Sequence, residues 1–165
     1  MAANAEQNME RFKGENHSAF VVGYTGEVGK ALVKDLNKLK IFKRVVLLGR
    51  REVTLDVGPE IEQKVVNFDK LEEEHADLFT GLDVGFCCLG TTRGRAGKEG
   101  FVKVDRDYVL ATARASKAAG CQQFSLVSST GADSNGMLLY TQTKGEAEEG
   151  TKKVGFDRLS IYRPA

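Results

Sequence analysis

The sequence contains no apolar run of the roughly 20 residues that a membrane-spanning helix requires. The first 17 residues, MAANAEQNMERFKGENH, are polar and lack the apolar segment of a secretion signal. An excess of one charge is also missing, because 24 basic and 23 acidic side chains leave a formal charge of +1. No overall field favours nucleic acid or anionic lipid, so any recognition of anions has to be local. These absences favour a cytoplasmic protein.

Residues that build disulfides and metal sites are scarce. The three cysteines, Cys87, Cys88 and Cys121, form an odd set with two adjacent members in an apolar stretch, which gives no disulfide framework. We interpret them as buried thiols, and we expect no metal site because no ligand-spaced partner accompanies them. The two histidines, His17 and His75, lie apart on polar segments and are expected to be surface side chains.

The chain does contain enough apolar residues for one core. Its 165 residues are 41% hydrophobic and 28% charged, which is typical of a single globular domain. Residues 1–17 are expected to form a polar N-terminal arm, or a short helix over Glu6–Lys13. Residues 18–165 are expected to form one dinucleotide-binding Rossmann domain.

The stretch SAFVVGYTGEVG predicts a strand that turns into a helix around a phosphate. Gly23 permits the tight turn, Gly26 lets the backbone approach a pyrophosphate, and Gly29 lets the helix pack closely on the strand. The amides of Tyr24–Val28 then face the anion at the positive end of the helix. Glu27 suits that helix end but would repel a pyrophosphate, so its side chain is expected to turn away. The glycine spacing alone also fits a strand-to-helix turn without a ligand.

Apolar runs and helical spacings alternate through the chain, as in repeated βαβ units. The expected strands are Ala19–Val22, Arg44–Gly49, Lys64–Phe68, Asp83–Leu89, Gln123–Val127 and Arg158–Tyr162. The first expected helix has an apolar face formed by Val28, Leu32, Leu36 and Leu39. Further helices are expected over the polar stretch Lys70–Phe79 and over Phe101–Ala119 and Met137–Lys153. The pattern predicts an α/β fold, a Rossmann-type doubly wound parallel sheet of about six strands.

Two arginines, Arg50 and Arg51, directly follow the second strand. An NAD-binding protein usually presents an acidic side chain at this place to the ribose 2′-hydroxyl. Guanidinium groups can instead hold a 2′-phosphate and stack on adenine, so the sequence predicts a preference for NADP(H). Two solvated surface arginines are the alternative interpretation.

The fourth strand runs into a glycine-rich stretch, GTTRGRAGKEG, that is expected to be a loop. Ligands of open α/β sheets bind at the carboxyl ends of the strands where the strand order reverses. The backbone at Leu89 and Gly90 should therefore pass close to the cofactor. The basic residues of this loop are Arg93, Arg95 and Lys98. They fit an anion-binding site and a solvent-exposed loop equally well.

A tyrosine and a lysine, Tyr140 and Lys144, lie four residues apart in a predicted helix and therefore on one face of it. A lysine cation stabilises a phenolate, which makes a tyrosine usable as an acid or base near neutral pH. Ser129, after the fifth strand, is the choice for holding a substrate carbonyl oxygen. Ser128 is less favoured because alternation points the two serines to opposite faces.

This ordered set of motifs resembles the short-chain dehydrogenase/reductase superfamily. The GxxGxxG spacing resembles its extended and atypical members, and runs such as CCLGTTRG, SSTGAD and FDRLSIYRP resemble a branch of pro-apoptotic, metastasis-suppressing oxidoreductases. The resemblance covers residues 18–164. It implies NADPH as the cofactor, with Tyr140 as proton donor and Lys144 as its partner. The implied cofactor-binding residues are Thr25, Gly26, Glu27, Val28, Arg50, Arg51, Leu89 and Gly90, and we expect Gly23, Gly29, Tyr140 and Lys144 to contact the cofactor as well.

The resemblance also implies roles outside metabolism. These are transcription regulation and apoptosis, with the nuclear-import and transcription machinery as protein partners and a nuclear as well as a cytoplasmic location. Members of the superfamily continue past the sixth strand with a segment that builds the substrate lobe, so a chain ending at Ala165 is expected to lack it. A regulatory protein that binds NADPH without turnover therefore stays open beside a carbonyl reductase whose substrate is unknown.

Overall fold

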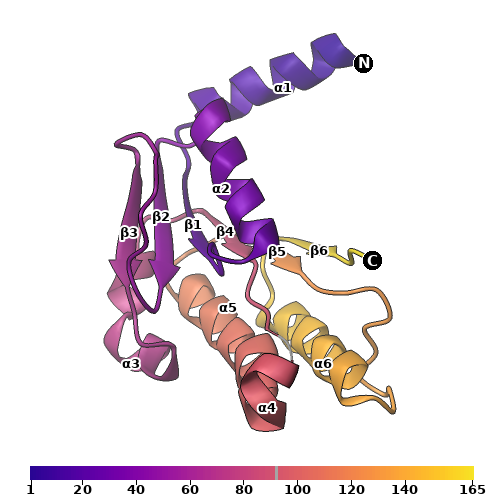
Figure 1. The fold of residues 1–165 in the computed structure, drawn as a ribbon. Helices are drawn as coiled ribbons and strands as arrows, with labels where there is room; N and C mark the ends of the chain where they lie inside the picture. Colours follow the sequence, from indigo (N-terminus) through magenta and orange to yellow (C-terminus); the bar gives the residue numbers. More distant parts are fainter. Residues whose placement is uncertain (92) are drawn as a thin grey trace.

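The computed structural model describes residues 1–91 and 93–165. Its centre is a six-stranded sheet in which all strands run parallel, in the order β3-β2-β1-β4-β5-β6 (Figure 1). The strands are β1 (Ser18–Val22), β2 (Arg44–Gly49), β3 (Ile61–Val65), β4 (Val84–Cys87), β5 (Gln123–Val127) and β6 (Arg158–Tyr162). The order reverses between β1 and β4, which confirms the Rossmann-type doubly wound sheet.

Helices cover the two faces of the sheet unequally (Figure 1). They are α1 (Ala2–Gly14), α2 (Glu27–Leu39), α3 (Leu71–Glu74), α4 (Arg93–Val102), α5 (Tyr108–Ala118) and α6 (Leu139–Val154). The apolar cluster on one face contains residues of α2, whereas the cluster on the other face contains residues of α3, α5 and α6. None of the described helices is long and apolar enough to cross a membrane.

The central strand β1 is buried along its whole length. Phe20 and Val22 pack into the cluster beneath α3, α5 and α6, while Ala19 and Val21 pack into the cluster beneath α2. A strand buried on both faces appears in a sequence as a continuous apolar run, because both sets of alternating side chains are interior. This explains why SAFVV predicts the strand so well.

Several expectations about the elements are wrong. The third strand is β3, Ile61–Val65, rather than Lys64–Phe68, because Ile61 pairs with Val45 and the Asn67 side chain accepts a hydrogen bond from the Asp69 amide to begin a 3₁₀ turn. The buried face of α2 is formed by Gly29, Val33 and Leu36, whereas Val28 and Leu39 are about half exposed.

The third correction concerns the glycine-rich stretch. It forms α4 rather than a loop, although the helix is interrupted at Gly97, whose φ is +74°. Thr92, in the same stretch, lies outside the described residues. A π-helical segment, Lys103–Asp107, joins α4 to α5, so the single helix expected over 101–119 is divided. One residue of this segment, Asp105, is almost fully buried.

We predict that Gly85→Ala destabilises the fold. A Cβ at this position of β4 would overlap the Phe20 ring, which packs edge-on against Phe79 with centroids 5.0 Å apart. Because overpacking a core costs about 1–3 kcal/mol, urea unfolding should show a loss of that size. Gly14→Ala is the control, since no atom lies within 4 Å of its added Cβ; an equal loss in both variants would contradict the prediction.

Candidate functional site

A cleft of about 710 Å³ lies at the carboxyl ends of β1, β2 and β4. This is the place where the strand order reverses, and open α/β sheets bind their ligands there. The lining residues come from the glycine turn, the end of β2, the end of β4 and the helices α4 and α5. They are Gly23, Tyr24, Thr25, Gly26, Leu48, Gly49, Arg50, Arg51, Phe68, Cys88, Leu89, Gly90, Thr91, Arg95, Ala96, Val104 and Tyr108.

The three glycines of the turn have different surroundings. Gly23 has a φ of +76°, and a Cβ there would overlap the backbone of Cys88 and Leu89. A Cβ on Gly29 would overlap the backbone of Gly23 and Tyr24, so this glycine brings α2 close to β1. Gly26 differs, because its Cβ would meet only the Gly23 carbonyl oxygen at 3.7 Å. The protein therefore has room for a side chain at Gly26, and the cleft beside it is where a phosphate would lie.

The β2 end of the cleft is positively charged. Arg50 and Arg51 are exposed and line it. No hydrogen bond or ion pair of either guanidinium is found among the described residues. The Tyr24 hydroxyl holds the local backbone, since it donates to the Arg51 carbonyl oxygen at 3.3 Å and lies 2.7 Å from Gln63 Oε1. Two guanidinium groups that have no carboxylate partner among the described residues are suited to binding a phosphate group.

An aromatic pair forms one wall of the same cleft. The rings of Phe68 and Tyr108 are stacked with centroids 5.3 Å apart. The Tyr108 hydroxyl donates to Asp69 Oδ1 at 3.0 Å, and Lys103 Nζ lies 2.7 Å from the same oxygen. Flat apolar surface next to two arginines suits an adenine ring. The sequence did not predict this pair, because Tyr108 follows Phe68 by 40 residues and lies in another element.

Lys144 lies beneath the opposite end of the cleft. Its Nζ is 2.7 Å from Asp105 Oδ1, and both side chains are buried. A Cβ on Gly90, which lines the cleft, would lie 3.6 Å from this Nζ and 3.5 Å from Asp105 Oδ1. The Thr91 amide donates to Asp105 Oδ2 at 3.0 Å. The ammonium is therefore separated from the cleft only by a glycine.

Asp105 is the functional residue that the sequence did not reveal. Burial raises the pKa of its carboxyl, while the Lys144 ammonium and the Thr91 amide oppose that rise. Burying two charges is costly unless they are paired, so the pair fixes Lys144 strongly in place. The π-helical turn brings Asp105 inward, and the local sequence KVDRD has no pattern that predicts such a turn.

Tyr140 lies at the open side of the same region. Its ring stacks on Phe101 with centroids 5.4 Å apart and is 45% exposed. Lys144 Nζ is 5.9 Å from the centre of the Tyr140 ring. The helix α6 thus presents both side chains on one face, as their spacing of four predicts. Neither residue is among those that line the cleft.

The two serines after β5 differ in burial. Ser129 is partly exposed, and its hydroxyl donates to the Thr130 carbonyl oxygen at 3.3 Å. Ser128 is buried, and its hydroxyl makes no hydrogen bond of good geometry among the described residues. It is near enough to Glu148 to help lower the pKa of that carboxyl. The accessible serine is therefore Ser129, although neither serine lines the cleft.

A second ion pair, between a buried carboxylate and a half-exposed guanidinium, follows one turn after Lys144 on α6. Glu148 is 2% exposed and binds Arg163 twice, with Nε to Oε1 at 2.9 Å and Nη2 to Oε2 at 2.6 Å. Burial raises the pKa of Glu148, but Arg163, Ser128 and Lys152 together outweigh the effect of burial, and the pKa is lowered overall. The pair ties α6 to the end of β6.

The cleft brings together many but not all of the predicted cofactor residues. Gly23, Thr25, Gly26, Arg50, Arg51, Leu89 and Gly90 line it, whereas Glu27, Val28, Gly29, Tyr140 and Lys144 do not. Glu27 is the first residue of α2 and is exposed. Val28 lines a neighbouring apolar groove with Leu32 and Tyr162, and Cys88 lines both this groove and the cleft.

The cysteines and histidines depart partly from expectation. Cys87 and Cys121 are buried as predicted, but Cys88 is half-buried and lines the cleft. Burial raises the pKa of Cys88 to about 11, which keeps it a neutral thiol rather than a nucleophilic thiolate. Both histidines are partly buried rather than fully exposed.

These features define the class of protein. A family model described as NAD(P)H-binding matches residues 23–159, and the chain belongs to this family. The cleft, its glycine turn and the exposed Arg50 and Arg51 fit such a ligand. Protein HTATIP2 of Rattus norvegicus is 50% identical over 157 residues, which cover 94% of this chain and 64% of the rat protein. The resemblance to the short-chain dehydrogenase/reductase superfamily is thereby confirmed.

More distant relatives and solved structures agree on the fold. "Protein FMP52-1, mitochondrial" of Scheffersomyces stipitis is 36% identical over 153 residues, covering 89% of this chain and 66% of its own length. The chain thus spans about two thirds of these relatives. A UDP-glucuronic acid 4-epimerase of Bacillus cereus in complex with NAD superposes with a TM-score of 0.69 at 15% identity, covering 88% of this chain and 55% of the epimerase. MoeE5 in complex with UDP-glucose and NAD gives 0.71 at 17% identity, with coverages of 88% and 53%.

The expected location is wrong. Three fungal relatives of this chain, at 34–36% identity, are named mitochondrial proteins. They come from Scheffersomyces stipitis, Eremothecium gossypii and Candida albicans. This conflicts with a purely cytoplasmic protein, and nothing in the comparisons supports a nuclear location. The error has a physical reason, because an apolar leader is the mark of secretion, whereas mitochondrial targeting segments are amphipathic.

We predict that two glycines of the turn respond differently to alanine. Gly26→Ala should leave the midpoint of urea unfolding nearly unchanged but weaken NADPH binding about tenfold or more, because its Cβ fits the protein and would overlap a phosphate. Gly29→Ala should instead lower the free energy of unfolding by about 1–3 kcal/mol, because its Cβ meets backbone. Calorimetric titration and urea unfolding of both variants check this, and unaltered NADPH binding by a folded Gly26→Ala variant would refute it.

Proposed function

We propose that this chain is the NADPH-binding part of an oxidoreductase that reduces a carbonyl group. The main support for this proposal is the geometry of the cleft. Two exposed arginines line its β2 end, and Lys144 lies beneath Gly90 at the other end. A dinucleotide lying between them would place its ribose 2′-phosphate at the arginines and its nicotinamide near the lysine.

The proposed preference for NADPH rests on Arg50 and Arg51. None of the described residues that line the cleft is acidic, so a ribose 2′-hydroxyl finds no carboxylate in that lining. Hydrogen bonds between a guanidinium and a phosphate are charge-assisted and stronger than neutral ones. The 2′-phosphate of NADPH therefore supplies binding energy that NADH lacks.

In the proposed reaction the chain's own residues supply the proton and hold the substrate. NADPH, when bound, supplies the hydride to the carbonyl carbon. The Tyr140 hydroxyl gives its proton to the carbonyl oxygen, so that the carbonyl becomes an alcohol and Tyr140 becomes a phenolate. The Lys144 ammonium stabilises that phenolate, and Asp105 fixes the ammonium. The Ser129 hydroxyl orients the carbonyl oxygen.

A second function, an NADPH-binding regulatory protein without turnover, is favoured by a specific observation. Tyr140, Lys144 and Ser129 lie outside the cleft lining, and Asp105 already neutralises Lys144. In this alternative the bound nucleotide sets the conformation that protein partners recognise. Partners from the transcription and nuclear-import machinery, and a role in apoptosis, rest on the sequence resemblance alone.

We predict that the arginines determine the choice of nucleotide. Calorimetric titration should show tighter binding of NADPH than of NADH, and Arg50→Ala or Arg51→Ala should reduce this ratio about tenfold, the value of one charge-assisted hydrogen bond. Arg44→Ala removes a cation from the opposite end of β2, where Arg44 pairs with Glu62, and should leave the ratio unchanged. Equal affinities for the two nucleotides in the unmodified chain would disprove the 2′-phosphate assignment.

We predict that turnover depends on the Tyr140 hydroxyl. With a panel of carbonyl compounds, Tyr140→Phe should lower NADPH oxidation about 100-fold or more, the usual contribution of a positioned general acid, and leave NADPH affinity unchanged. Tyr162→Phe is the control, because this exposed tyrosine lies at the end of β6. Firm NADPH binding without any Tyr140-dependent turnover would favour the regulatory alternative.

A further inference from the structure

The N-terminal helix α1 is joined to the body at one end only (Figure 1). It has no buried residues. Among the described residues its aromatic contacts come from Phe12, which packs edge-on against Phe42 with centroids 5.5 Å apart and tilts against the His17 ring at 4.9 Å. So little buried apolar surface holds a helix weakly, and the polar contacts at its end therefore matter.

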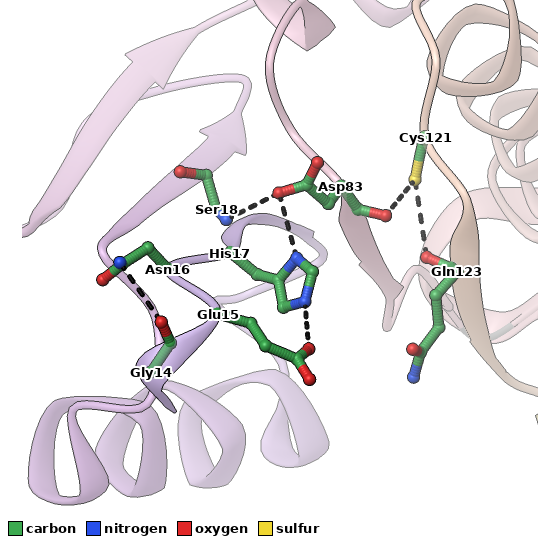
Figure 2. Close-up of polar contacts among 8 residues, drawn as sticks. All are labelled: Gly14, Glu15, Asn16, His17, Ser18, Asp83, Cys121 and Gln123. Carbon is green, nitrogen blue, oxygen red and sulfur yellow. Dashed lines mark hydrogen bonds and ion pairs between the residues drawn. The ribbon is translucent and has the colours of Figure 1, made fainter. Parts of the chain in front are cut away.

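His17 lies between two carboxylates at the junction of α1 and β1, as Figure 2 shows. Its Nε2 is 2.7 Å from Glu15 Oε2, and its Nδ1 is 3.4 Å from Asp83 Oδ2. Glu15 belongs to the end of α1, whereas Asp83 directly precedes β4. The imidazole thus links the N-terminal segment to the edge of the sheet at which the strands begin.

The number of protons on this ring decides how many of these contacts it can make. An imidazolium has two N–H donors, but a neutral imidazole has one donor and one lone pair. Carboxylates only accept, so both contacts of His17 require the charged ring. In the neutral ring the proton stays at Nε2 with the closer Glu15 carboxylate, and the Nδ1 lone pair faces the carboxylate of Asp83.

Asp83 is the fixed partner in this cluster. Its Oδ2 also accepts from the Ser18 amide at 3.1 Å, and its carbonyl oxygen accepts from Cys121 Sγ at 3.4 Å (Figure 2). The amides of Gln122 and Gln123 donate to the same carbonyl oxygen. The Lys43 amide also donates to the His17 carbonyl oxygen at 2.9 Å. Loss of the ring contact would therefore leave the His17 backbone and β4 in place, and the segment before His17 would move.

We propose that His17 is a proton-operated anchor, which holds α1 against the sheet when the ring is charged and releases it when the ring is neutral. The anchor is independent of the proposed catalytic function, because it lies at the opposite end of the strands from the NAD(P)H cleft. It gives the chain a conformational response to pH in a segment whose contact with the core comes from Phe12.

Other charges face the ring across a cleft of about 540 Å³. Arg11 and Glu15 come from the N-terminal segment, Asp83 from the start of β4, and Asp157 and Arg158 from the start of β6. Three carboxylates and two guanidiniums leave one negative charge, which a proton on His17 balances.

The direction of the pH response follows from the same contacts. Glu15 raises the pKa of His17 above its ordinary value, burial opposes the rise, and Asp83 adds to it. A raised pKa in the anchored state means that the anchoring free energy is fully present below the pKa of the free ring. It is lost as the pH rises through the raised value. Release is therefore expected on the alkaline side.

The experiment is an NMR titration of the unmodified chain from pH 5.5 to 8.5. The imidazole signals of His17 should titrate together with loss of the contact between the Phe12 and Phe42 rings. Exchange of the last-turn amides of α1, corrected for intrinsic rates, should rise about threefold or more in the same interval. His75 is an internal control, because its Nε2 accepts from the Asn67 amide and has no carboxylate partner. Retention of the ring contact through the whole His17 titration would overturn the proposal.

Glu15→Gln separates this anchor from a general effect of pH. A glutamine amide can donate to Nε2, so a neutral ring can then give its single N–H to Asp83, and α1 should stay anchored at pH 8.5. Glu10→Gln removes the same charge from an exposed position of the same helix and should behave like the unmodified chain. Release of α1 in Glu15→Gln at the same pH as in the unmodified chain would contradict the assignment of His17.

Discussion

The whole site depends on how closely β1 and β4 approach each other at the point where the strand order reverses. Gly23 leaves β1 with a φ of +76°, and its missing Cβ is the space that the backbone of Cys88 and Leu89 occupies. This single close approach opens the cleft on one side and positions Gly90 over Lys144 on the other. A side chain at Gly23 would separate the two strand ends, and the glycine turn, the arginines and the lysine would no longer share one cleft.

Buried charge then fixes the one helix that carries the proposed chemistry. Along α6, Lys144 pairs with Asp105 and Glu148 pairs with Arg163, so the helix is tied to the π-helical segment on one side and to β6 on the other. Such pairs add little net stability compared with apolar packing, but a broken pair leaves an uncompensated buried charge. Their effect is to restrict α6 to one rotation and one height, which is what a positioned Tyr140 requires.

Much of the fold could be predicted from local pattern, and the reasons are physical. The bounds of β2, β5 and β6 agree with prediction, because each apolar run ends where the chain leaves a sheet covered on both faces. The glycine turn and the two arginines were also predicted, since each is contiguous in sequence. The rotation of α2 was not, because Val28, Leu32 and Leu36 give a helical period as good as the observed set of Gly29, Val33 and Leu36.

Features that depend on contacts distant in sequence escaped prediction. Asp105 meets Lys144 across 39 residues, and Tyr108 stacks on Phe68 across 40. His17 looked like a surface residue because its partner Asp83 belongs to another strand. In each case a single polar or aromatic residue has no periodicity of its own, so only the folded chain reveals its role.

The π-helical segment has a consequence for how this chain could change over evolution. Such a turn holds one residue more than an α-helical turn, so Lys103–Asp107 behaves as an insertion absorbed within a helix. Deleting one residue there would restore a regular α-helical turn and leave the helices on either side in the same orientation. Tyr108 would then keep its place in the wall of the cleft, whereas Asp105, which lies within the segment, would lose its inward position and its contact with Lys144. The extra residue of this segment therefore places a carboxylate beneath the cleft without changing the course of the helix.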